Sequence, residues 1–119
     1  MFYLKKIING RMNVPEPEYY TANVAIEEGQ ALVLSSGKLA LADANKPTYI
    51  AMADAAANAV CPVMKVMPNM VFETKSAGAV TLGTKYPLAD SATIGTGTSN
   101  TFATVVGAYP DNVVHVIFE

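Results

Sequence analysis

Short runs of apolar residues alternate with polar turn residues along most of the chain. From Thr21 onward, turn residues recur about every eight to twelve positions, the spacing expected of an all-β sandwich or barrel. One predicted hairpin is ALVLSSGKLALA, with Ser35, Ser36 and Gly37 in its turn; another is formed by TFATVVGAY and VVHVIFE, joined by PDN. In no segment do apolar residues recur at the spacing of an amphipathic helix, so the pattern predicts a mainly β fold.

Composition limits the size and the surface of this fold. A chain of 119 residues suits one domain, which we place at 21–119 as a small barrel or sandwich of short antiparallel strands. Apolar types make up 51% of the chain and charged types 15%. Because charge is sparse for a free soluble domain, we expect a partner to cover part of the apolar surface.

Residues 1–20 differ from the rest and predict an extended N-terminal arm. Lys5, Lys6 and Arg11 precede the first acidic residue, and Pro15 and Pro17 favour extended backbone. Fully extended, such an arm would reach about 65 Å. A basic arm suits an acidic surface, whereas a first strand of the domain's own sheet is the other interpretation.

Two prolines and four methionines mark the middle of the chain. Pro62 and Pro68 lie in VCPVMKVMPNMVFE, and a strand with missing N–H groups on one side is predicted to lie at a sheet edge. Flexible thioethers either adapt to a partner surface or fill the core, and both interpretations stand for the methionines. They are Met52, Met64, Met67 and Met70.

Candidate catalytic and metal chemistry is sparse. His115 is the single histidine and Cys61 the single cysteine, so the usual soft-ligand zinc set and an intrachain disulfide are not expected. Asp residues lie beside turn residues, which favours turn or capping roles; Asp54 would cap a short helical turn at 54–58. A small hydrolase using Asp90 or His115 is the weakest interpretation, and we expect no enzyme and no cofactor.

Charge and hydropathy exclude two classes of partner. The net charge of −2 and the pI near 5.3 do not provide the basic face that nucleic acid requires. No apolar run approaches the roughly 20 residues of a membrane span, and the N-terminus lacks the features of a secretory signal.

A six-residue pattern occurs twice, as KLALAD at 38–43 and KYPLAD at 85–90, each close behind a glycine. We interpret the copies as two strand–loop units in which Asp opens a turn. The loops that follow, ANKPT and SATIGTGTSN, are then predicted to be surfaces that a partner contacts.

Two long stretches resemble the capsid decoration proteins of tailed bacteriophages, also called cement or head-stabilisation proteins. The first is VAIEEGQALVLSSGKLALADANKPTYIAMADAAANAVCPVMKV, and the second is VTLGTKYPLADSATIGTGTSNTFATVVGAYPDNVVHVIFE. The similarity covers roughly residues 22–119 and lies in the succession of strands and turns. It implies a β-barrel or β-tulip that binds the outer surface of an icosahedral shell and stabilises the expanded capsid.

The resemblance also implies partners and a location. The partner would be the major capsid protein, with self-association as a homotrimer favoured over a dimer or monomer, and the protein would be made in the host cytoplasm and reside on the virion. By composition, contacts are assigned to the arm, to the adjacent tyrosines and to three methionines. These residues are Phe2, Tyr3, Lys5, Lys6, Arg11, Pro15, Pro17, Tyr19, Tyr20, Met64, Met67 and Met70.

One alternative function is a phage head or fibre module that binds a carbohydrate or a receptor. Its platform would use the tyrosines Tyr19, Tyr20, Tyr49 or Tyr109, although the absence of tryptophan counts against it.

Overall fold

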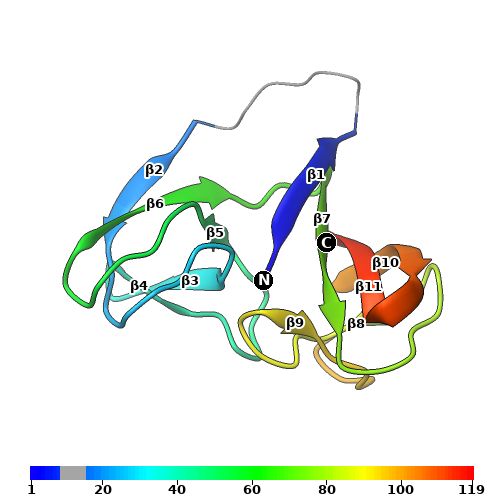
Figure 1. The fold of residues 1–119 in the computed structure, drawn as a ribbon. Coiled ribbons are helices and arrows are strands. Elements are labelled where there is room, and N and C mark those ends of the chain that lie inside the picture. Colours follow the sequence, from blue (N-terminus) through cyan, green and yellow to red (C-terminus); the bar gives the residue numbers. More distant parts are fainter. Residues whose placement is uncertain (9–15) are drawn as a thin grey trace.

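A computed structural model describes residues 1–8 and 16–119, which form two β-sheets lying side by side (Figure 1). The order of the first sheet, sheet A, is β1 (Tyr3–Ile7), β7 (Met70–Ser76), β11 (Val113–Phe118), β10 (Ala103–Tyr109) and β8 (Lys85–Tyr86), with β9 (Thr93–Ile94) also on β7. The order of the second, sheet B, is β2 (Glu18–Thr21), β6 (Val60–Lys65), β5 (Tyr49–Ala51), β3 (Ala31–Ser35) and β4 (Lys38–Leu41).

The prediction of a mainly β fold with short antiparallel strands is confirmed in its sandwich-like form. All named strand pairs are antiparallel except β7 with β9. A single bridge between Ala22 and Leu39 brings the two edges of sheet B together, but neither sheet closes into a barrel within the described residues. The same part of the chain contains no helix long and apolar enough to cross a membrane.

Alternation along the strands builds the larger core. In β11, Val114, Val116 and Phe118 are buried, whereas His115 lies on the opposite face, because successive side chains of a strand point to opposite sides. The rings of Phe2, Phe72 and Phe102 surround Phe118 at centroid distances of 5.5, 5.7 and 6.4 Å. A smaller core lies against sheet B and consists of Ala22, Ile26, Leu32, Leu39, Tyr49, Ala51, Cys61 and Val63.

Both predicted hairpins are present. The turn between β3 and β4 contains only Ser36 and Gly37, with φ of 51° and 79°, and two left-handed residues match the twist that a two-residue hairpin requires. Between β10 and β11 the 3₁₀ turn η1 (Pro110–Asn112) includes Asp111 and Asn112, also with positive φ. Asp and Asn tolerate this backbone conformation better than most residues.

The edge-strand prediction for the proline-containing segment is wrong. This segment forms two strands, β6 between β2 and β5, and β7 between β1 and β11, while Pro68 lies in the connecting loop. Pro62 fits an interior strand because its backbone lies opposite the end of β5. Its carbonyl accepts the Met52 N–H at 2.9 Å, one residue beyond Ala51, which is the last residue of β5 paired with β6. The N–H that proline lacks would point the same way, where no ladder bond is needed.

Two loop predictions also need correction. The predicted helical turn at 54–58 is absent: Ala55 forms a β-bridge with Ile26, and Asp54 Oδ1 accepts the Glu28 N–H at 2.8 Å. The loop SATIGTGTSN contains β9, whose Ile94 is fully buried beside β7. This parallel pairing joins segments that no local turn connects, so the local pattern did not indicate it.

The described parts of the predicted arm belong to the domain. Residues 3–7 pair with β7 as β1, and residues 18–21 pair with β6 as β2. The interpretation of a first strand therefore describes Tyr3–Ile7 better than an arm does. Arg11 and Pro15 lie outside the described residues.

Candidate functional site

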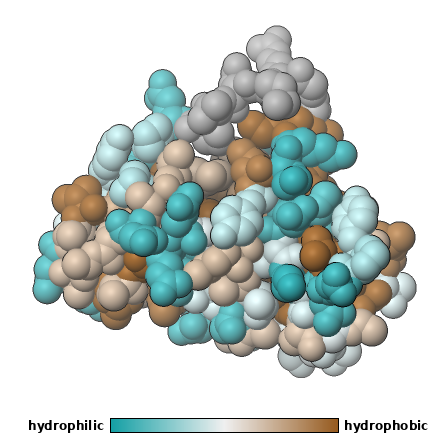
Figure 2. All heavy atoms as spheres, in the orientation of Figure 1, coloured by the Kyte–Doolittle hydropathy of each residue, from teal (hydrophilic) through white to brown (hydrophobic). Residues whose placement is uncertain are grey.

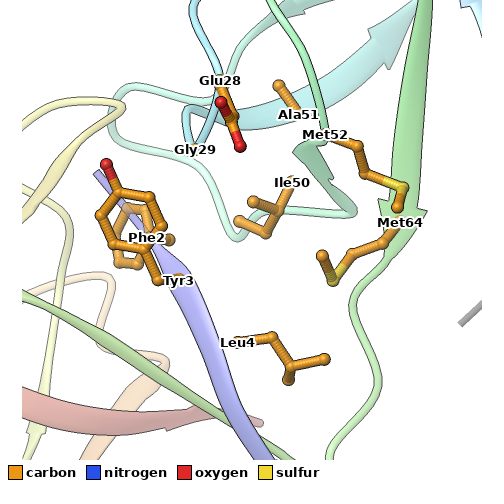
Figure 3. Close-up of a pocket in the computed structure, with 9 residues that line it drawn as sticks. All are labelled: Phe2, Tyr3, Leu4, Glu28, Gly29, Ile50, Ala51, Met52 and Met64. Atoms are coloured by element: carbon orange, nitrogen blue, oxygen red, sulfur yellow. The ribbon is translucent and has the colours of Figure 1, made fainter. Parts of the chain in front are cut away.

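An apolar groove of about 140 Å³ separates β1 from strands β5 and β6 of sheet B (Figure 3). Phe2, Tyr3 and Leu4 lie on one side of it, and Ile50 and two methionines lie on the other. The remaining lining comes from Glu28, Gly29 and Ala51. The groove is thus lined by the N-terminal segment together with Met52 and Met64, which the sequence analysis singled out as separate features.

Gly29 determines how closely β1 approaches sheet B. The Phe2 N–H donates to the Gly29 carbonyl at 2.7 Å, and the Gly29 N–H donates to the Ala51 carbonyl at 2.9 Å. A Cβ on Gly29 would lie 2.9 Å from the Met1 Cβ, and its φ of +89° is one that side chains rarely adopt. Glycine at this position therefore allows the backbone link that closes one end of the groove.

Strand β1 leaves one edge unpaired. Within the described residues it pairs only with β7, and the Phe2 N–H points away from β7 toward Gly29. Because backbone groups alternate along a strand, the N–H and C=O of Leu4 also point away from β7, toward the side on which no described strand pairs with β1. A bulge lies between Leu4 and Lys6, so the regular edge is short.

Exposed apolar side chains extend from the groove along sheet B. Tyr19 lies opposite Pro62 across the β2–β6 ladder, and Val60 and Met64 share that face of β6. Tyr19 is 64% exposed and Val60 is 62% exposed. Figure 2 shows apolar side chains grouped in several places on one face of the molecule. We name Tyr19, Val60, Pro62 and Met64 the β6 stripe.

The structure describes ten of the twelve predicted contact residues, all except Arg11 and Pro15. Phe2 and Met70 are buried in the core, and Phe2 also forms part of the wall of the groove. Partly buried are Tyr20 and Met64. The exposed members are Tyr3, Lys5, Lys6, Pro17, Tyr19 and Met67. The loop residues Glu28 and Gly29 were missed because composition selected only aromatic, basic, proline and methionine side chains.

The outer face of sheet A carries a polar cluster. His115 Nε2 lies 2.9 Å from Glu73 Oε2, and Lys5 Nζ lies 3.7 Å from the same oxygen. The Tyr109 ring packs against the His115 ring in a tilted arrangement, with centroids 4.7 Å apart. The hydrogen bond with His115 and the positive charge of Lys5 hold the pKa of Glu73 below its ordinary value. This arrangement orients the His115 ring. Asp90, the other residue of the hydrolase interpretation, makes its hydrogen bonds elsewhere, where its Oδ1 accepts from the Ala92 N–H and the Thr93 Oγ1–H.

The four tyrosines proposed as a sugar platform do not form one surface. Tyr49 is 6% exposed, and its hydroxyl lies 3.2 Å from that of Tyr20, which donates to Glu18 at 2.7 Å. These two hydrogen bonds raise the pKa of Tyr20. Only Tyr19 and Tyr109 are exposed, and they lie on different sheets.

No three residues among the described histidines, cysteines and carboxylates lie together in a way that could hold a metal ion. No protein-family description matches the chain, and no curated protein is detectably similar to it. The groove and the β6 stripe are therefore interpreted from their own geometry.

Proposed function

We propose that this protein is a non-enzymatic structural component of a tailed-phage head, binding the outer surface of the icosahedral shell and stabilising its expanded form. The resemblance of residues 22–119 to decoration proteins supports this function. The structural observation that carries it is the apolar groove beside the unpaired edge of β1. A groove with an open strand edge suits binding by shape and backbone rather than catalysis.

In this proposal an extended segment of the major capsid protein lies along β1. Its backbone bonds to the free N–H and C=O of Leu4, and an apolar side chain enters the groove beside Met52 and Met64. The bulge after Leu4 limits this pairing to the start of β1. The contact is small, so its strength comes from many copies on a symmetric shell.

The exposed β6 stripe would complete the contact or join neighbouring copies, for which a homotrimer is favoured. Pairing of β1 with β1 of a second copy is disfavoured, because exposed Lys5 and Lys6 would bring like charges together. Lysines on an edge strand hinder pairing between two copies of the chain, whereas a partner of different sequence can still pair with this strand.

The test mixes the purified protein with expanded, DNA-free shells of the phage whose genome encodes it. Electron microscopy is expected to show added density at symmetric positions on the outer surface. Unchanged shells at saturating protein would contradict the proposal.

Two variants test the groove itself. Met52→Glu places a charge in the groove, and Leu4→Pro removes the edge N–H; each is expected to lower shell occupancy at least about tenfold. Leu34→Glu is the matched control, because Leu34 is 39% exposed at the β3–β4 hairpin, which does not line the groove. Thermal unfolding of every variant separates lost binding from lost folding. If Met52→Glu and Leu34→Glu bind shells equally well, the groove is not the contact.

The carbohydrate-platform alternative receives less support, because Tyr49 is buried and Tyr20 is bonded to it.

A further inference from the structure

The two loops that follow the repeated KxxLAD pattern meet in space. The loop after β4 and the loop before β10 together line a surface hollow of about 320 Å³. Its lining residues are Ala44, Asn45, Lys46, Asn100, Thr101 and Phe102. Segments that are far apart in the sequence and belong to different sheets therefore form one side of the molecule.

Four polar side chains around this hollow have no hydrogen-bond partner among the described residues: Asn45, Lys46, Asn100 and Thr101. They offer two carboxamides, a hydroxyl and an ammonium group. Carboxamides can donate to one ligand hydroxyl and accept from its neighbour, and an ammonium group binds a carboxylate.

The backbone beneath these groups is held in place. The Phe102 N–H donates to the Tyr86 carbonyl at 3.2 Å, and the Phe102 carbonyl accepts the Glu119 N–H at 2.9 Å. On the other loop, the Asn45 N–H donates to the Ala42 carbonyl at 2.8 Å. Phe102 is 7% exposed and packs near Phe118, so it gives the hollow a fixed apolar floor. Such preorganisation lowers the entropy lost on binding.

The one charged side chain in the lining of the hollow is that of Lys46, and a positive charge favours an anionic ligand. The pKa of nearby Glu119 is lowered mainly by its hydrogen bond with Thr104, and to a smaller extent by the charges of Lys85 and Lys46. The Glu119 carboxylate is already engaged, because it accepts from Thr104 Oγ1 at 2.8 Å and lies 3.6 Å from Lys85 Nζ. Among the described residues no carboxylate lies within ion-pair distance of Lys46, so its ammonium group can bind a ligand.

We propose that this hollow binds an acidic saccharide, with its hydroxyls on the Asn45 and Asn100 carboxamides and its carboxylate on Lys46. The site is separate from the groove beside β1, and it does not depend on the capsid function proposed above.

The test is an amide chemical-shift titration of the ¹⁵N-labelled protein at constant pH and ionic strength, with sodium glucuronate as the probe and glucose as the neutral comparison. Glucuronate is expected to shift the amides of residues 44–46 and 100–102. Lys46→Gln is expected to weaken glucuronate binding about tenfold while leaving glucose binding unchanged, whereas Asn45→Ala should weaken both.

Lys38→Gln is the matched control, since Lys38 is also exposed but lies in the β3–β4 hairpin. If Lys38→Gln and Lys46→Gln weakened glucuronate binding equally, the weakening would come from the change in net charge rather than from this site, and the proposal would be overturned. It would also be overturned by a titration in which glucuronate, up to its solubility limit, shifts none of these amides. Binding that Asn45→Ala weakens and Lys46→Gln does not would overturn the assignment to acidic sugars.

Discussion

Glu73 and His115 face each other across the β7–β11 ladder, with Glu73 Oε2 2.9 Å from His115 Nε2. The pair lies on the outer face of sheet A, and Lys5 of β1 approaches the same carboxylate. Three neighbouring strands are thus connected through one side chain. Since the pKa of Glu73 is lowered from its ordinary 4.5, the pair also couples stability to pH.

We expect Glu73→Gln to remove part of the acid sensitivity of folding. A carboxylate with a lowered folded-state pKa stabilises the fold above its unfolded pKa, and this stability is lost as pH falls through the folded pKa. The difference in free energy of unfolding between wild type and Glu73→Gln should therefore be largest above about pH 4.5 and shrink below it. Urea unfolding across this range measures the difference. The control Glu27→Gln, at an exposed position, should differ little from wild type at every pH.

Cys61 should be protected from thiol reagents in the native protein. Its side chain is fully buried, and burial raises the pKa of the thiol, so little reactive thiolate is present at neutral pH. The rate of labelling by an aromatic disulfide reagent should rise at least about a hundredfold on unfolding in urea. Rapid labelling of the folded protein would show that the smaller core opens readily.

Replacing Phe2 should destabilise the fold far more than replacing its neighbour. Phe2 is 1% exposed and packs against Phe118, so Phe2→Ala should lower the free energy of unfolding by about 3–5 kcal/mol. Tyr3 is 53% exposed, and Tyr3→Ala should cost less than about 1 kcal/mol. Equal effects in chemical denaturation would mean that the N-terminus is an arm, as the sequence suggested. Deleting residues 1–18 would remove β1 and the first residue of β2, so it should destabilise the domain.

The predictable parts of this fold are those set by neighbouring residues. Ser36 and Gly37 are turn residues between two apolar runs, and the alternation in β11 identifies which of its residues are buried. Pairings of β1 with β7 and of β9 with β7 were not predictable, because they join segments without a local turn.

The candidate sites were predictable only in part. Composition selected Phe2, Tyr3 and Met64, which all line the groove, but Phe2 is buried there, and the selected Met70 is buried in the core. Aromatic and thioether side chains serve cores and interfaces equally well, so their type alone does not distinguish the two. The repeated pattern pointed to two surface loops without indicating that they meet.

Gly29→Ala and Gly37→Ala form a matched pair that isolates the contact between β1 and sheet B. Both glycines have positive φ, so each alanine should cost about 1–2 kcal/mol in backbone strain. A Cβ at Gly37 would meet no atom within 4 Å, whereas one at Gly29 would lie 2.9 Å from the Met1 Cβ and 3.3 Å from the Phe2 carbonyl oxygen. Gly29→Ala should therefore cost an additional 1–3 kcal/mol or so, and it should also expose the amide of Phe2 to hydrogen exchange. If the two variants unfold at the same urea concentration, β1 does not need the close approach at Gly29, and the groove beside it is not a fixed feature of the fold.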